Sequence, residues 1–378
     1  MAKNDKIYSW EFFILLMALS LGVFLRFSLS ALGYNVDIVN FWNTVNYIIS
    51  GENLYAATDK YNYGPIWGYA LAFFTKLLNI TDINNFRILI TSLLTIADAI
   101  ICVIVSKKFG RYYGAFFFLN PISIFVSGYH GQFDNFAIMV GLLSVIIYSN
   151  SRSNSSFIIG LVFLGLSLSI KHILFMLPIW FFMSERNLFK KICFLLVPYG
   201  LFFISFIPFL PEGANGVITN VFAYRSFNNA PFWSFVVPYS LYVFVPKFIL
   251  FLGSLFVCGF LLRRHSPLEI FLNYLALTLI FSSAVALQYL VIPVLFLIIY
   301  WNTWFIFYLV IASATYMAHN DGISLVVLRD YVGWNGRFGI HLSVLAFGIG
   351  YLMSKVRKDQ LRMYGKIIVD NSRKLFID

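Results

Sequence analysis

Long apolar stretches recur along the whole chain, and this recurrence restricts the fold more than any other feature. A helix of about 20 apolar residues crosses the hydrocarbon core of a bilayer, which is ~30 Å thick. Apolar stretches of that kind lie between residues 10 and 354, and only 11% of the 378 residues are charged. About a quarter of a typical soluble domain is charged. The sequence therefore predicts an all-α protein that crosses the membrane many times.

Lysine and arginine set the predicted orientation, because the cytoplasmic loops of membrane proteins are rich in basic residues. The formal net charge of +11 comes mostly from short loops, so it indicates topology and does not indicate nucleic-acid binding. The segment "KKFGR" at 107–111 falls on the same side as Lys3 and Lys6 only if residues 64–79 lie along the membrane surface. We therefore expect about eleven to thirteen spans, cytoplasmic termini, and a first outer loop at 32–86 that contains an interfacial helix.

The chain shows no internal repeat and no polar stretch long enough for a soluble domain. We expect a single integral-membrane domain over residues 1–378, with a catalytic module at 1–210 and a more variable helical module at 211–378. The three cysteines each lie inside an apolar stretch without metal-ligand spacing, so they are predicted to be small buried side chains. The expected location is the plasma or inner membrane of a microbe, with the working face outside.

Polar residues that are uncommon in so apolar a chain gather at the predicted outer rim. The segment "GYHGQFD" at 128–134 places His130, Gln132 and Asp134 at the hairpin where two predicted spans, 112–128 and 132–149, meet. Ionisable residues at membrane depth usually mark a functional site, although a hairpin that simply faces water is the alternative. The two glycines would let a second backbone or a ligand come close.

The first outer loop carries one acid among apolar and aromatic neighbours, Asp37. It fits a helix cap, and it also fits a general base that takes a proton from a sugar hydroxyl. Further along the loop, "YNYGPIW" at 61–67 contains Tyr63 and Trp67. These rings could stack on a sugar or form an ordinary interfacial aromatic belt.

Basic residues near the same rim are candidate ligands for an anion. Lys171 and His172 interrupt an apolar stretch, and Arg225 lies in an outer loop. A phosphate would be a suitable partner for a buried lysine, and a guanidinium binds phosphate with paired hydrogen bonds. An exposed arginine can also be a surface charge without a specific role. Asp98, inside a predicted span, needs a partner as well, and a structural ion pair is as plausible there as a catalytic role.

No phosphate-binding loop, dinucleotide fingerprint, metalloprotease motif or cysteine–histidine zinc pattern occurs in the chain, and no DxD pair does. The sequence therefore indicates neither a metal nor another cofactor, and it leaves a divalent metal open.

Four motifs in order resemble the GT-C superfamily of integral-membrane glycosyltransferases. They are Asp37 with "YNYGPIW", the hairpin from Asn120 to Asp134, Lys171 in "KHILFMLP", and Gln288–Tyr289 ahead of Pro293. The resemblance is nearest to dolichyl-phosphate-glucose-dependent glucosyltransferases and bacterial mannosyltransferase-like relatives. Two positions depart from the pattern: Gly64 stands where a proline is common, and Leu287 precedes Gln288 in place of a proline.

The resemblance implies an inverting sugar transfer on the outer or lumenal face. It does not identify the sugar, because related sequences move different hexoses, and we expect glucose or mannose. The donor would be a polyprenyl-phosphate sugar and the acceptor a lipid-linked glycan or another hydroxyl compound. Asp37 would be the catalytic base, and Lys171 with Arg225 would hold the donor phosphate. The other expected substrate-binding residues are Tyr63, Trp67, His130, Gln132, Asp134, His172, Gln288 and Tyr289.

Two other classes of function remain open at the level of sequence. A flippase or transporter for a lipid-linked sugar would place charges near the midplane and would use paired broken helices. An O-antigen or capsule polymerase would be expected to carry a large outer loop with several arginines, whereas the loop at 211–235 is modest and has one.

Overall fold

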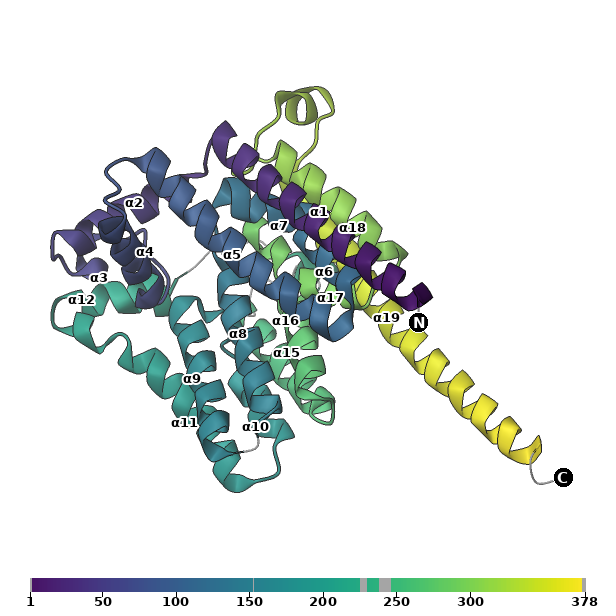
Figure 1. The fold of residues 1–378 in the computed structure, drawn as a ribbon. Coiled ribbons are helices and arrows are strands. Elements are labelled where there is room, and N and C mark those ends of the chain that lie inside the picture. Colours follow the sequence, from purple (N-terminus) through teal and green to yellow (C-terminus); the bar gives the residue numbers. More distant parts are fainter. Residues whose placement is uncertain (1, 152, 225–229, 238–245, 376–378) are drawn as a thin grey trace.

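The computed structural model describes residues 2–151, 153–224, 230–237 and 246–375, and every regular element in these ranges is a helix (Figure 1). The first part of the chain forms α1 (Ala2–Leu32), α2 (Val36–Ile49), α3 (Leu54–Ala57), α4 (Pro65–Leu77), α5 (Ile83–Phe109), α6 (Arg111–Phe118), α7 (Pro121–Phe125), the π-helix η1 (Val126–His130) and α8 (Asp134–Ser149).

The middle of the chain forms α9 (Asn154–Ile170), the 3-10 turn η2 (His172–Leu174), α10 (Leu177–Ser184), α11 (Leu188–Ile204), η3 (Ile207–Phe209), α12 (Leu210–Gly216) and η4 (Val217–Phe222). The last part forms α13 (Pro231–Val236), α15 (Lys247–Leu262), α16 (Pro267–Phe281), η5 (Leu287–Val291), α17 (Val294–Ile299), α18 (Thr303–Ala318), η6 (Val327–Tyr331) and α19 (Gly336–Leu375).

Helix starts follow from side-chain caps that the sequence provides. Asp82 accepts hydrogen bonds from the backbone N–H groups of Asn84 and Asn85 at the start of α5. Ser266 and Glu269 form a reciprocal capping box at the start of α16. Such caps satisfy backbone donors that a helix end leaves without an intrahelical partner.

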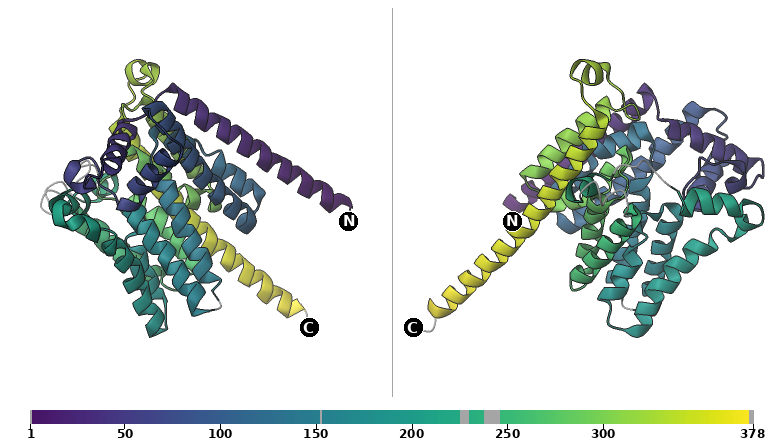
Figure 2. Two further views of the ribbon diagram at one scale, coloured as in Figure 1. Left: turned by 60° about the vertical axis from the view of Figure 1, so that its left-hand side comes forward. Right: turned by 180° about the vertical axis from the view of Figure 1, so that it is seen from behind.

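Four helical segments in the described ranges are long and apolar enough to cross a membrane, and six are if each of two bent pairs counts as one span. Four further apolar helices are shorter. The predicted all-α membrane class is confirmed, whereas the number of eleven to thirteen spans stays a prediction. The α1 helix lies at the edge of the molecule (Figure 2) and exposes Phe24 and Met17, as expected of a helix that faces lipid.

The α16 helix is apolar around most of its circumference. Every residue of α16 from Ile270 to Ile280 is buried, and a helix that is hydrophobic all round belongs inside a bundle.

The α4 helix has 13 residues, which corresponds to about 20 Å of helix and is too short to cross ~30 Å of hydrocarbon. Its expected position along the membrane surface stays a prediction.

Residues on both sides of position 210 pack together near the first outer loop. Asn53 donates a hydrogen bond to the Phe209 carbonyl at 3.0 Å, and Asn220 donates one to the Thr58 carbonyl at 3.2 Å. The predicted division into modules at 1–210 and 211–378 stays a prediction.

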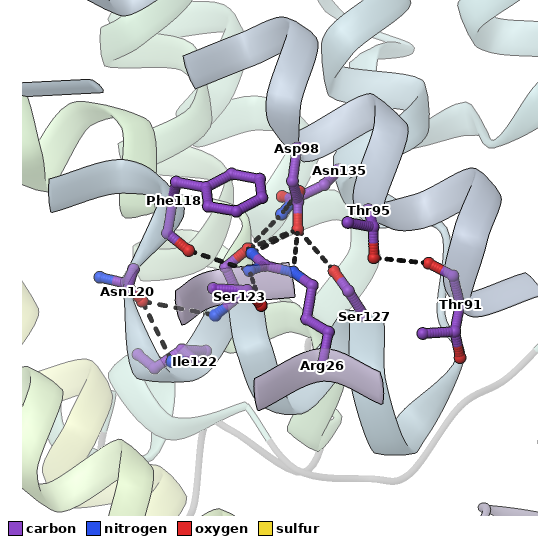
Figure 3. A network of polar contacts seen from close by, with 11 residues as sticks. Arg26, Thr91, Thr95, Asp98, Phe118, Asn120, Ile122, Ser123, Ser127 and Asn135 are labelled. Atoms are coloured by element: carbon purple, nitrogen blue, oxygen red, sulfur yellow. Dashed lines mark hydrogen bonds and ion pairs between the residues drawn. The ribbon is translucent and has the colours of Figure 1, made fainter. Parts of the chain in front are cut away.

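Inside the bundle, the Asp98 carboxylate pairs with Arg26 of the first helix at 2.8 Å, and both side chains are fully buried (Figure 3). Arg26 also donates to the carbonyls of Gly22 and Phe118. Ser123 and Asn135 add hydrogen bonds to the same carboxylate. The partner that Asp98 was expected to need is therefore Arg26, and the network joins α1, α5, α7 and α8.

Candidate active site

The polar hairpin is a sharp break between helices, as its sequence predicts. Asn120 caps α7 through hydrogen bonds from the backbone N–H groups of Ile122 and Ser123, and Pro121 follows at the first helical position, where no N–H is needed. The segment 121–130 meets α8 at an angle of 120°.

Gly131 makes this break possible. Its φ is +72°, a conformation that favours glycine, and its N–H closes η1 on the Val126 carbonyl at 2.8 Å. A Cβ at this position would also lie 2.2 Å from the Ile38 side chain of α2. The hairpin and the first outer loop therefore come into direct contact at Gly131.

Asp37 lies in the first turn of α2, where Asn35 is the cap. Its Oδ2 lies 3.2 Å from His130 Nε2 and accepts a hydrogen bond of 2.6 Å from Gln132 Nε2. Because a carboxylate only accepts, His130 Nε2 carries the proton in this contact. The Asp37 side chain is 24% exposed, and Oδ1 has no hydrogen-bond partner among the described residues.

The Gln132 amide connects Asp37 to Lys171. Its Oε1 accepts a hydrogen bond of 3.0 Å from Lys171 Nζ, while Nε2 donates to Asp37 and to the Tyr63 hydroxyl. Only this orientation of the amide fits, since the lysine can only donate and the carboxylate can only accept.

Lys171 is the residue that breaks the second helix pair, where α9 meets 172–184 at 116°. Its ammonium forms an ion pair with Asp134 Oδ2 at 2.7 Å, and both side chains are buried, at 5% and 0% exposure. The rings of Phe133, Tyr63 and Tyr289 lie 4.9, 5.1 and 5.9 Å from Nζ. The sequence predicted Lys171 at the rim, but its observed partner is a carboxylate of the same site.

Aromatic side chains pack behind these polar groups. Trp67 is buried and stacks on Phe133 at 4.5 Å, so its sugar-stacking role stays a prediction while its observed contact is internal. Gly64 packs against the backbone of Ser169, where a Cβ would lie 1.9 Å from the carbonyl oxygen. The presence of glycine at position 64, where the related pattern commonly has proline, therefore has a steric reason in this chain.

The Asp37 carboxylate is kept ionised by its neighbours. Burial alone would raise its pKa, but hydrogen bonds and charge from His130, together with Gln132 and Lys171, outweigh burial and hold the pKa below its ordinary value of 3.8. An ionised carboxylate with one anchored oxygen and one open oxygen can accept a proton from a bound hydroxyl.

The remaining predicted residues are not all brought together. Tyr289 reaches Lys171, but within the described ranges His172 and Gln288 make no hydrogen bond or ion pair with the side chains around Asp37. Arg225 lies outside the described residues. The substrate-binding role of each of these residues stays a prediction.

Sequence reasoning missed two contributors from the end of α18. The Tyr316 ring meets His130 edge-on at 6.1 Å, and Asn35 donates a hydrogen bond of 2.6 Å to the Asp321 carbonyl. A tyrosine in the apolar segment "IASATYMAHN" resembles any other aromatic of this chain, so no sequence signal singled it out. Among the described residues, no group of three or more His, Cys, Asp or Glu side chains could hold a metal ion.

No family model matches the chain, and no curated protein matches it either. Among solved structures, it is similar to ArnT from Cupriavidus metallidurans. The apo structure covers 94% of this chain and 77% of ArnT with 11% identity and a TM-score of 0.47. The structure bound to undecaprenyl phosphate covers 90% and 76%, with 11% identity and a TM-score of 0.48. By itself, a similarity of this size assigns neither a family nor an activity to this chain.

Proposed function

We propose that this chain is a membrane glycosyltransferase of the GT-C type. It transfers a hexose, glucose or mannose, from a polyprenyl-phosphate donor to a lipid-linked glycan or another hydroxyl acceptor at the outer face. The observation that best supports this proposal is the state of Asp37. One carboxylate oxygen is fixed by His130 and Gln132, and the other is open in a side chain that is 24% exposed.

In the proposed reaction the acceptor hydroxyl gives its proton to Asp37 Oδ1 as its oxygen attacks the anomeric carbon of the donor. The bond between that carbon and the phosphate oxygen breaks, and the bonding electrons leave with polyprenyl phosphate. Attack from the face opposite the phosphate inverts the anomeric centre. His130 and Gln132 hold the base in place and keep it ionised, which a general base requires.

The leaving phosphate carries negative charge, and cations near it stabilise the transition state. Lys171 and Arg225 stay proposals for this role. The Lys171 ammonium already contacts Asp134 and Gln132, so phosphate binding there would require a rearrangement of the ion pair. The proposal includes no metal or other cofactor.

One observation supports a flippase for lipid-linked sugars as the second candidate. The two bent helix pairs follow one another in the chain, and Lys171 at one break meets Asp134 at the other. Broken helices with charged groups at the break also occur in transporters.

The test uses the purified full chain in proteoliposomes, polyprenyl-phosphate glucose or mannose, and a lipid-linked glycan acceptor. We expect free polyprenyl phosphate and a glycosylated acceptor of inverted configuration to appear together. A donor that crosses the bilayer intact, with no polyprenyl phosphate released for either sugar, would contradict the transferase and identify a flippase.

A further inference from the structure

Three buried polar atoms close to the candidate base have no hydrogen-bond partner among the described residues. They are Asp134 Oδ1, His130 Nδ1 and the Tyr316 hydroxyl. The three residues are 0%, 2% and 0% exposed. Buried polar atoms in proteins are nearly always hydrogen-bonded. Three such atoms on a hairpin and on a ring that contacts it indicate a position that a ligand fills.

The three atoms belong to one corner of the site. His130 and Asp134 flank the turn of the hairpin, and the Tyr316 ring lies edge-on to His130 at 6.1 Å. Tyr316 also stacks on Phe125 at 5.6 Å, which fixes its ring. His130 also lies 3.2 Å from Asp37 Oδ2 through its Nε2 atom. His130 therefore joins this corner to the carboxylate of Asp37.

The chemistry of these atoms excludes a phosphate as their main ligand. Asp134 Oδ1 only accepts hydrogen bonds, whereas His130 Nδ1 accepts when the ring is neutral and donates when the ring is charged. The Tyr316 hydroxyl can donate. A ligand that satisfies all three must both donate and accept, whereas phosphate oxygens mainly accept.

The charges in this corner lead to the same conclusion. The only ammonium that the described residues place here, Lys171, is paired with Asp134 at 2.7 Å, and Asp37 adds a second carboxylate. A site whose neighbouring charges sum to a negative value disfavours the binding of a further anion. Sugar hydroxyls are neutral and can donate and accept at once.

We propose that this corner binds the ring hydroxyls of the donor sugar, and that Tyr316 is a specificity-determining residue that contacts one of them. This inference rests on the proposed transferase function. The phosphate of the same donor then lies on the side of the sugar opposite Asp37 and does not contact Asp134 Oδ1.

The test measures kcat/KM of wild type and Tyr316→Phe with polyprenyl-phosphate glucose or mannose and with analogues that each lack one ring hydroxyl. Sites built to bind a hydroxyl lose activity when it is absent. We expect Tyr316→Phe to lose about tenfold or more with the complete sugar, and to lose nothing further with the one analogue that lacks the contacted hydroxyl. Competition by polyprenyl phosphate without a sugar should stay unchanged.

Tyr308→Phe is the matched control, because Tyr308 is buried in the same helix but donates its hydroxyl to the Leu290 carbonyl. Any loss in this variant should be the same for every donor. The inference is overturned if Tyr316→Phe loses the same factor with every analogue, or loses none. If wild type transfers sugar from no donor, the proposed function itself fails, and the inference fails with it.

Discussion

Asp98 and Asp134 are both completely buried carboxylates, and each holds a cation, Arg26 at 2.8 Å and Lys171 at 2.7 Å. Their other contacts differ. Asp98 accepts five hydrogen bonds, from Arg26 Nε and Nη2, Ser123, Ser127 and Asn135, so both of its oxygens are occupied. Asp134 binds Lys171 through Oδ2, and its Oδ1 has no partner in the described ranges.

The difference separates an ion pair whose polar groups are all hydrogen-bonded from one with an open acceptor. A buried pair is tolerated when further hydrogen bonds satisfy its remaining donors and acceptors, and Arg26–Asp98 meets this condition. A buried polar atom without a hydrogen-bond partner requires a ligand or another explanation. Asp134 Oδ1 is such an atom. The two pairs are linked through adjacent residues of α8, because Asn135 bonds to Asp98 while Asp134 binds Lys171.

Asp98→Asn should have the largest effect on stability. The new amide N–H₂ group would face the Asn135 amide nitrogen at the Oδ1 position or the Arg26 guanidinium at the Oδ2 position, both of which only donate. Arg26 would also lose its counter-charge. We expect a loss of about 3–5 kcal/mol in the free energy of unfolding, measured by thermal or denaturant unfolding in detergent. Arg26→Leu combined with Asp98→Leu should recover much of this loss, because an apolar pair leaves no buried charge.

Asp134→Asn should have the opposite profile. The amide nitrogen can occupy the open position of Oδ1, while the amide oxygen still accepts from Lys171. Lys171 loses the charge of Asp134 but keeps the charge of Asp37, so the loss of stability should be smaller than for Asp98→Asn. Transfer per folded molecule should fall about tenfold or more, because the open acceptor is lost. Equal losses of stability for the two variants, with normal transfer by Asp134→Asn, would abolish the distinction between the two pairs.

His130→Phe should move the pH dependence of kcat/KM. Burial raises the pKa of Asp37, and His130 is the largest of the influences that lower it. Without His130 the pKa therefore rises, and activity should be lost at a higher pH than in wild type as the solution is acidified.

His265→Phe is the control for this profile, since His265 contacts the Leu262 carbonyl at the end of α15 and no residue of the site. Its acid limb should coincide with that of wild type. An unshifted limb in His130→Phe, or one shifted to lower pH, would show that His130 does not support the ionised base.

The smallest effect concerns the surface position of α4. Single cysteines at Asn84 and Asn85, both exposed, should react with a membrane-impermeant thiol reagent from outside intact cells. Cys102 and Cys193 are buried and should give little background. Labelling only from the cytoplasmic side would show that residues 64–79 cross the membrane.

The sequence predicted the break at 128–134 and the acid of the first outer loop because both signals are local. Glycine at a required positive φ, a proline after a capping asparagine, and polar residues in an apolar chain can be read without knowledge of packing. For the same reason the all-α membrane class followed from composition alone.

Partner identity could not be predicted in the same way. Arg26 and Asp98 are 72 residues apart, and Lys171 and Asp134 are 37 apart, so only the packing of helices decides which charges meet. Tyr316 escaped notice because its importance depends on an unpaired hydroxyl and not on its residue type. Charge type and position along the chain suggested a phosphate ligand at Lys171, whereas the fold supplies a carboxylate.

The most direct test of the account is the transfer rate of Asp37→Asn. The variant keeps the shape of the side chain but cannot take a proton from the acceptor hydroxyl, and loss of a general base costs about 10²–10⁴ in rate. Asp59→Asn is the control, because Asp59 is 74% exposed and pairs only with Lys60 in the described ranges. In single-turnover transfer from polyprenyl-phosphate hexose, Asp37→Asn should bind donor normally and react at least a hundredfold more slowly, while Asp59→Asn keeps most of its activity. Transfer by Asp37→Asn at nearly the wild-type rate would contradict the central claim.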